Sequence, residues 1–142
     1  MTLNEVQDSI IEDFSIFEDD VDRYQQLIDI GRNYPKIDEK KKTNQYLIQG
    51  CQSKVWIDAK YENGKVQYFA DTNSDITKGF VALLIKVLSD RTPEEILEAD
   101  LYFIPKIGLK DILSPTRSNG LVAMVKQMRM YALAYQAKSN NS

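Results

Sequence analysis

The chain has no histidine, and this absence excludes whole classes of active site. Without an imidazole there is no Cys–His or Ser–His–Asp catalysis and no zinc site with a histidine ligand. A single cysteine rules out an internal disulfide, a CxxC redox pair and an all-cysteine metal site. One thiolate also cannot hold an iron–sulfur cluster, which normally takes four. Any chemistry of this thiol therefore involves a second molecule.

The sequence also has no long hydrophobic run. No apolar stretch approaches the roughly 20 residues of a membrane span, and the acidic, amphipathic N-terminus does not have the pattern of a signal peptide. We therefore expect no membrane association and a location in the reducing cytoplasm, where a free thiol persists. With 142 residues, 43% of them hydrophobic, the chain suits one domain at residues 1–138, followed by a disordered tail at 139–142.

Charge is spread unevenly along the chain. Residues 1–39 carry 11 acidic and 3 basic side chains, whereas residues 115–142 carry 4 basic and no acidic ones. The formal net charge is −3, and no basic stripe is interleaved with aromatic residues, so we expect no nucleic acid partner. The asymmetry is better suited to a protein partner.

The spacing of apolar residues predicts helices in the first and last parts of the chain, with a short strand-forming region between them. Helical periodicity runs through four segments: 3–17, about 19–32, 76–88 and 121–135. The third segment is apolar nearly all round and is predicted to be the most buried. Thr92-Pro93-Glu94-Glu95 has the pattern of a capped helix start, and residues 101–113 are predicted to form short helical pieces with turns.

Between these helices the apolar period changes to two. Val55–Tyr61 is predicted to be a half-buried strand, and Lys65–Ala70 is predicted to return antiparallel to it through the Asn63-Gly64 turn. Residues 46–49 are a candidate for a further short strand. The expected fold class is α+β, with a small antiparallel sheet of about three strands packed against several helices.

The only cysteine, Cys51, stands in a polar run between Ile48 and Val55. A structural cysteine usually lies among large apolar residues. Here Gly50 allows a tight turn, so the thiol is expected to be exposed at a loop. This setting favours a chemically used thiol over the alternative, an inert small residue of the core.

Three local strings resemble the SufE family, which includes the CsdE proteins. They are GCQSKVW at 50–56, SDITKG at 74–79 and LSPTRSNGL at 113–121. Their order and spacing match over roughly residues 5–137, nearly the whole chain. The pattern departs little: Thr116 stands where many members carry Ser, and the turn at Thr72-Asn73 is composed differently.

The resemblance implies an α+β fold shared with the IscU scaffold proteins and a role in iron–sulfur cluster assembly. SufE-like proteins accept persulfide sulfur from a cysteine desulfurase of the SufS or CsdA type, stimulate that enzyme and pass sulfur to a SufBCD-type scaffold. The pyridoxal phosphate (PLP) belongs to the desulfurase, so no bound cofactor is expected here beyond a covalent persulfide on Cys51. The chain would be an accessory protein rather than an independent enzyme. An IscU-like scaffold carries three cysteines, whereas a carrier needs one.

In this interpretation Cys51 is the nucleophile, and Arg117 and Asp75 are the next candidates. A cation at the first turn of a helix opposes the helix dipole, so Arg117 could pair with Asp75 or with a carboxylate or persulfide of the partner. The plainer alternatives are an exposed arginine without a role and a helix cap at Ser74 or Asp75. Support of the loop, or contact with the partner, is expected from the sequence neighbours of the thiol: Gly50, Gln52, Ser53 and Lys54.

Two other functions remain open on the sequence alone. A single cysteine can act as a peroxide-sensing thiol, and a SufE-like chain can be an adaptor without sulfur transfer. The expected oligomeric state is a monomer or a weak homodimer.

Overall fold

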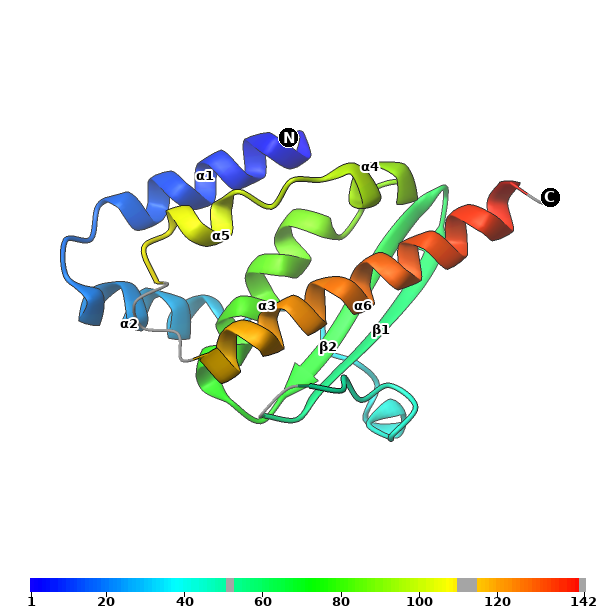
Figure 1. The fold of residues 1–142 in the computed structure, drawn as a ribbon, viewed down its shortest axis with the longest axis horizontal. Coiled ribbons are helices and arrows are strands. Elements are labelled where there is room, and N and C mark those ends of the chain that lie inside the picture. The colour runs from blue at the N-terminus through cyan, green and yellow to red at the C-terminus, as the bar shows by residue number, and fades with distance from the viewer. Residues whose placement is uncertain (51–52, 110–114, 141–142) are drawn as a thin grey trace.

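The computed structural model describes residues 1–50, 53–109 and 115–140 (Figure 1). Its elements in chain order are α1 (Leu3–Ser15), α2 (Asp20–Ile30), the 3-10 turn η1 (Glu39–Lys41), β1 (Val55–Glu62), β2 (Lys65–Thr72), α3 (Asp75–Leu88), α4 (Pro93–Glu98), α5 (Phe103–Lys106) and α6 (Pro115–Asn140). Among these residues no helix is both long and apolar enough to span a bilayer. The α+β class expected from the sequence is confirmed.

The two strands form an antiparallel hairpin in the register from Val55↔Thr72 to Glu62↔Lys65. Its turn is the expected one, because Asn63 and Gly64 both have positive φ, at 56° and 77°. Alternate residues of the two strands are buried and form one inner face: Val55, Ile57, Ala59, Val66, Tyr68 and Ala70. Helices α3 and α6 pack on this face, and α1 and α2 pack in turn on α3.

The expectation of about three strands is corrected to two within the described residues. The segment 46–49 makes a single antiparallel bridge, Leu47↔Trp56, instead of a ladder. Two hydrogen bonds accompany it: the Ile48 N–H donates to the Val55 carbonyl at 2.8 Å, and the Ile57 N–H donates to the Tyr46 carbonyl at 3.1 Å. Residues 49 and 50 form a turn, so the pairing ends after this single bridge.

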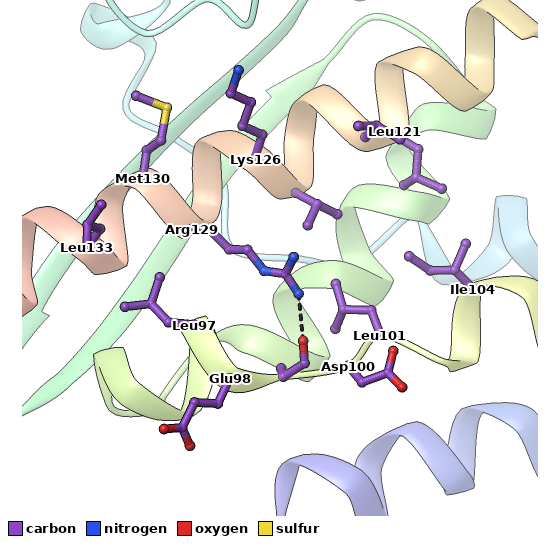
Figure 2. Close-up of a pocket in the computed structure, with 13 residues that line it drawn as sticks. Leu97, Glu98, Asp100, Leu101, Ile104, Leu121, Lys126, Arg129, Met130 and Leu133 are labelled. Atoms are coloured by element: carbon purple, nitrogen blue, oxygen red, sulfur yellow. Dashed lines mark hydrogen bonds between the residues drawn. The ribbon is translucent and has the colours of Figure 1, made fainter.

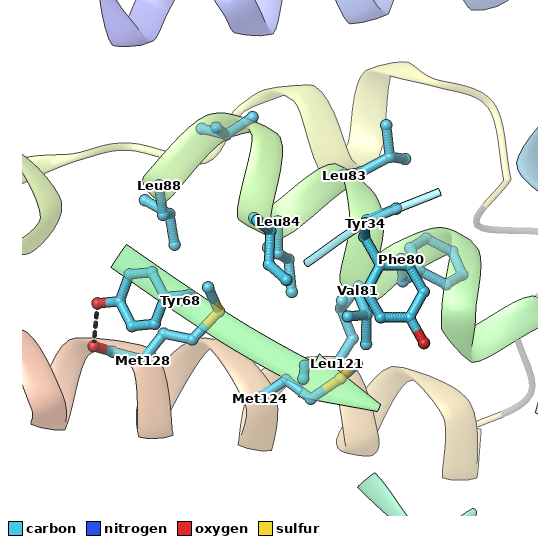
Figure 3. Packing of buried hydrophobic residues seen from close by; sticks show 14 of the residues in the cluster. Tyr34, Tyr68, Phe80, Val81, Leu83, Leu84, Leu88, Leu121, Met124 and Met128 are labelled. Atoms are coloured by element: carbon cyan, nitrogen blue, oxygen red, sulfur yellow. Dashed lines mark hydrogen bonds between the residues drawn. The ribbon is translucent and has the colours of Figure 1, made fainter. Parts of the chain in front are cut away.

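One part of the core lies between the hairpin, α3 and α6 (Figure 3), and buried residues of α1, α4 and α5 continue it. Helix α3 is buried on most sides, as its composition predicts. Tyr68 of β2 points toward α6, where its buried hydroxyl donates a 2.6 Å hydrogen bond to the Met128 carbonyl (Figure 3). Leu84 and Leu88 of α3 lie on the side of the Tyr68 ring that faces away from α6 (Figure 3). A buried hydroxyl needs such a partner, so this bond helps to fix α6 on the sheet.

Helices α2 and α3 approach each other closely through two glycines. A Cβ added at Gly79 would lie less than 3.0 Å from the carbonyl oxygen and side chain of Leu27. One added at Gly31 would meet the backbone of Lys78 and Gly79 at similarly short distances. The absence of side chains at both positions is what allows this contact.

Helix α6 presents three different faces. Leu121, Met124, Met128 and Ala132 are buried in the core. The hydroxyls of Tyr131 and Tyr135 donate to the carbonyls of Ile57 and Ala59 on β1, at 2.8 and 2.9 Å. A third face is exposed. The helix extends to Asn140, so Ser139 and Asn140 are helical where a disordered tail was expected. Residues 141–142 lie outside the described residues.

Candidate functional site

The cysteine-bearing segment is a loop whose base is closed by backbone pairing. The Leu47↔Trp56 bridge and the Ile48–Val55 hydrogen bond bring its two ends together. Cys51 and Gln52 lie outside the described residues. Gly50 and Ser53, their sequence neighbours, are described: Gly50 is exposed and Ser53 is half-buried.

Gly50 has the left-handed conformation that favours glycine, with φ of +91°. A Cβ at this position would lie 3.9 Å from the Cβ of Ala123 on α6, which is an ordinary contact distance. Space is therefore available for a side chain, and the backbone conformation is what calls for glycine. The first end of the loop thus lies beside the N-terminal half of α6.

The other end of the loop is held by the turn between β2 and α3. The Lys54 N–H donates a 3.2 Å hydrogen bond to the Asn73 side-chain oxygen. The next residue, Ser74, caps α3 by accepting from the Thr77 N–H at 3.4 Å. The described parts of the three strings singled out in the sequence therefore lie on the same side of the molecule, where β1, α3 and α6 begin (Figure 1).

Asp75 lies in the first turn of α3, is largely exposed and does not cap the helix, because Ser74 does. Its Oδ1 lies 4.0 Å from Nζ of Lys78, one turn further along α3. Arg117 belongs to the first turns of α6, but its side chain lies outside the described residues. The expected pairing of Asp75 with Arg117 therefore stays a prediction. Lys54 is exposed, as a partner contact requires.

A polar cluster supports the segment that leads to the loop. Asp71 of β2 accepts hydrogen bonds from the Tyr34 hydroxyl at 2.9 Å and from the Thr72 N–H at 2.8 Å. It also forms an ion pair with Lys42 at 2.5 Å. Lys36 lies over the Tyr34 ring, 3.1 Å from its centroid. The cluster ties the chain before the loop to the end of β2, opposite Trp56.

The contacts within this cluster determine the charge states of its side chains. Burial by itself would raise the pKa of Asp71, but the hydrogen bonds from Lys42, Thr72 and Tyr34 outweigh it and lower the pKa. The hydrogen bond to Asp71 raises the pKa of Lys42, and burial raises that of Tyr34. Asp71 and Lys42 therefore stay charged, and Tyr34 stays neutral, near pH 7.

Sequence reasoning did not single out Asn73, Asp71 or Ala123. The only signal for Asn73 was its place next to Ser74, in a turn noted for its unusual composition. Asp71 occupies a half-exposed alternating position of a strand, which is typical of an ordinary surface residue. Its partners Tyr34 and Lys42 are remote in sequence and are brought to it only by the fold.

Nowhere in the described ranges do three acidic or thiol side chains converge as metal ligands. Lys54 is exposed at the second end of the loop, and its backbone hydrogen bond to Asn73 brings that end beside the start of α3.

Comparison with known proteins gives a consistent answer. The family model described as "SufE: Fe-S metabolism associated domain" matches residues 8–132. An uncharacterized SufE-like protein of Synechocystis is 40% identical over 127 residues, which are 89% of this chain and 80% of that protein. A SufE-like protein of Rhizobium etli is 37% identical, covering 86% of each chain.

Two further matches extend this result. SufE-like protein 1 of Arabidopsis thaliana, described as chloroplastic/mitochondrial, is 39% identical over 91% of this chain, which spans only 35% of that longer protein. The solution structure of a hypothetical protein from Thermus thermophilus superposes with a TM-score of 0.76 over 93% of this chain and 96% of its own. At 22% identity, that likeness bears on the fold alone.

Proposed function

The chain belongs to the SufE family, whose domain is associated with Fe–S metabolism, and we propose that it is a sulfur acceptor for a cysteine desulfurase. Cys51 takes the persulfide sulfur of a PLP-dependent partner of the SufS or CsdA type. It thereby stimulates the partner and then delivers the sulfur to a SufBCD-type scaffold. The observation that carries the proposal is the only cysteine of the chain, placed in a loop whose two ends the fold holds.

The transfer is a thiol–persulfide exchange. The Cys51 thiolate attacks the terminal sulfur of the desulfurase persulfide. A new S–S bond forms, the old one breaks, and the desulfurase cysteine leaves as a thiolate. In the second step a thiolate of the scaffold attacks the terminal sulfur now on Cys51, and Cys51 leaves as a thiolate. Each step needs one thiol of this chain and no resident cofactor.

The loop supports this exchange in two ways. An unperturbed thiol with a pKa of about 8.5 is only a few per cent ionised near pH 7, so a nearby cation or helix N-terminus raises the reactive fraction. Lys54 and α3 are the described groups that can act in this way. Arg117 and Asp75 are proposed to contact the partner or its persulfide, and Gln52 and Ser53 to donate hydrogen bonds to the sulfur. The reducing cytoplasm is the compartment in which this thiol would stay free.

The test is the intact mass of the protein after incubation with a SufS-type desulfurase and free cysteine, without reductant. We expect a gain of one or more sulfur atoms that is absent in Cys51→Ser. A circular dichroism spectrum equal to that of the native protein would show that the variant folds.

Two results would count against the proposal. If Cys51→Ser stimulates the desulfurase as well as the native protein does, the chain is an adaptor. If the thiol gains oxygen under peroxide but gains no sulfur from any of several active desulfurases, it is a redox sensor.

A further inference from the structure

An apolar groove lies between α6 and the segment that carries α4 and α5 (Figure 2). Its volume is about 900 Å³. One wall is formed by Leu97, Leu101 and Ile104, and the other by α6 from Leu121 to Leu133. At a rise of about 1.5 Å per residue, this stretch of α6 is about 18 Å long. The groove is therefore long enough to take about three turns of a second helix.

The exposed face of α6 lies between this groove and the cysteine-bearing loop. Successive residues of a helix are about 100° apart, so Ala123 and Met130, which are seven residues apart, lie nearly in line. Ala123 is the residue that approaches Gly50 at the first end of the loop. Lys126 and Met130 point from α6 away from the α4–α5 segment, whereas Arg129 points toward it (Figure 2). One face of α6 thus leads from the loop to the groove.

Large apolar side chains project from this face. Val122, Met130 and Leu133 are 67%, 53% and 55% exposed. The other exposed large hydrophobic residues in the described part of the chain are scattered over its N-terminal region. Single exposed apolar residues are ordinary, whereas several on one face beside an apolar groove mark a contact surface.

The two rims of the groove carry opposite charges. Glu98 and Asp100 lie exposed on the α4–α5 side, and Lys126 lies exposed on the α6 side. None of the three forms an ion pair with another described residue. A protein that fills the groove is therefore best recognised by the reverse arrangement, with an acidic group toward α6 and a basic group toward the α4–α5 segment.

The walls of the groove suit a helix as occupant. The Arg129 guanidinium reaches across from α6 and donates a 2.6 Å hydrogen bond to the Ala99 carbonyl on the opposite wall (Figure 2). Because the two walls are already joined, a molecule that enters has little reorganisation to drive. The same bond occupies the Ala99 carbonyl, so the groove presents mainly side chains. A helix docks through side chains, whereas an added strand needs free backbone groups.

We propose that this groove docks the cysteine desulfurase and that its occupant is an amphipathic helix of that enzyme. The inference rests on the proposed sulfur transfer. An enzyme that reaches Cys51 must cover the loop, and the exposed face of α6 continues its footprint from Ala123 into the groove. Apolar side chains of the docked helix cover Met130 and Leu133, and a carboxylate beside them meets Lys126. The surface strengthens binding and takes no part in the chemistry.

The test is a titration of a SufS-type desulfurase with this protein, followed by cysteine turnover. Leu133→Glu places a charge in the apolar contact. We expect the concentration for half-maximal stimulation to rise about tenfold or more, while stimulation at saturation equals that of the native protein. Val21→Glu, at a 72% exposed position of α2, is the matched control and should behave like the native protein. A small-molecule persulfide donor should load Cys51 equally in all three proteins.

Charge reversals test the arrangement of the partner. Lys126→Glu and Glu98→Lys should each raise the half-maximal concentration several-fold, and more so at low ionic strength. The double variant should be no better than the singles, because it reverses both contacts with a separate partner. Lys86→Glu, at an exposed position of α3, is the control and should leave the titration unchanged.

Three results would overturn the proposal: an unchanged half-maximal concentration in Leu133→Glu, an equal rise in Val21→Glu, or a double variant that recovers native behaviour, which would make a second copy of the chain the occupant. If the native protein gains no sulfur and gives no stimulation, the proposed function itself fails and docking fails with it. If the native protein gains sulfur and Leu133→Glu titrates normally, only the docking proposal fails. Circular dichroism confirms that each variant is folded.

Discussion

The backbone N–H of Lys54 donates to the side chain of Asn73, and this 3.2 Å hydrogen bond joins the cysteine-bearing loop to the turn before α3. The bond lies at the surface, so its contribution to global stability is small, on the order of 1 kcal/mol or less. Its importance is positional. It holds the strand-side end of the loop next to the N-terminus of α3, while Gly50 lies beside α6.

Replacing Asn73 with alanine should therefore impair sulfur acceptance more than folding. We expect the initial rate of persulfide formation on Cys51 to fall several-fold in Asn73→Ala, because the loop samples geometries that the desulfurase cannot use. The melting temperature should change by only a few degrees, as expected for about 1 kcal/mol in a domain of this size. Rates come from quenched mass spectrometry with a fixed concentration of desulfurase.

The matched control for this variant is Asn33→Ala, an exposed asparagine in the turn after α2. Its sulfur acceptance should equal that of the native protein. An unchanged rate in Asn73→Ala, or an equal fall in Asn33→Ala, would remove the positional role assigned to Asn73.

The Asp71 cluster should give the protein a defined pH window of stability. Because the folded state lowers the pKa of Asp71, its contribution is complete above the unfolded pKa of about 3.9 and is lost as pH falls through the folded value. Because the folded state raises the pKa of Lys42, its contribution is complete below about 10.4 and is lost as pH rises through the folded value. The ion pair therefore acts fully between about pH 4 and pH 10.

Asp71→Asn isolates the acidic side of that window. The amide can still accept from Tyr34 but leaves the half-buried Lys42 paired only with the exposed Glu39 among the described residues, so the free energy of unfolding near pH 7 should fall by about 1–2 kcal/mol. Urea unfolding at several pH values measures this loss. The difference from the native protein should shrink below pH 4, where Asp71 itself becomes neutral. The exposed Asp13→Asn is the control, and a constant difference at all pH values would contradict the assignment.

Two tyrosines of α6 cover the outer edge of β1, and each can be tested separately. Burial raises the pKa of Tyr131 to about 12, so its hydroxyl remains a donor to Ile57 throughout the neutral range. Tyr131→Phe and Tyr135→Phe should each lower the free energy of unfolding by about 1 kcal/mol, because a partly buried carbonyl loses its partner.

The control for these variants is Tyr61→Phe. The Tyr61 ring stacks on Tyr135, with centroids 5.2 Å apart, and phenylalanine preserves that stacking. Chemical denaturation of the three variants should therefore leave Tyr61→Phe close to the native protein. Equal losses in all three would mean that ring packing, rather than the hydroxyls, carries the effect.

Much of the fold could be predicted from local patterns. The Asn63-Gly64 turn, the capping box at Thr92–Glu95 and the apolar α3 all formed as expected, because each depends on residues close in sequence. The segment 46–49, a candidate for a further short strand, makes only one bridge to β1, and its four residues are too few to carry an alternating pattern that would have decided the matter. Apolar residues mark the last helix only from Leu121, but Arg117 was expected just before or at its first turn, and the helix does begin at Pro115.

The candidate site also contains residues that could be predicted from the sequence and residues that could not. The cysteine motif and the Ser74 cap could be found by their spacing, and the structure brings their described residues together. Asn73 and Asp71 could not, because nothing local distinguishes an asparagine in a turn or an aspartate on a strand. Their roles come from partners that only the folded chain supplies.

The contact between α2 and α3 permits a prediction in which two effects have opposite signs. Glycine inside a helix costs about 1 kcal/mol relative to alanine, so propensity alone would make Gly79→Ala stabilising. The added Cβ, however, would lie less than 3.0 Å from the Leu27 carbonyl, a backbone group that cannot move without shifting α2. Overpacking of this kind typically costs about 1–3 kcal/mol and can exceed the gain, so we expect a net loss of stability.

Gly31→Ala should destabilise for the same reason, since its Cβ would meet the backbone of Gly79 from the opposite helix. The double variant should lose less than the sum of the two single losses, because one separation of α2 from α3 relieves both clashes. Lys86→Ala, at an exposed position of α3, is the control and should unfold like the native protein. A Gly79→Ala protein with an unchanged or raised melting temperature would mean that α2 yields easily, and that the glycine contact does not set the separation of the two helices.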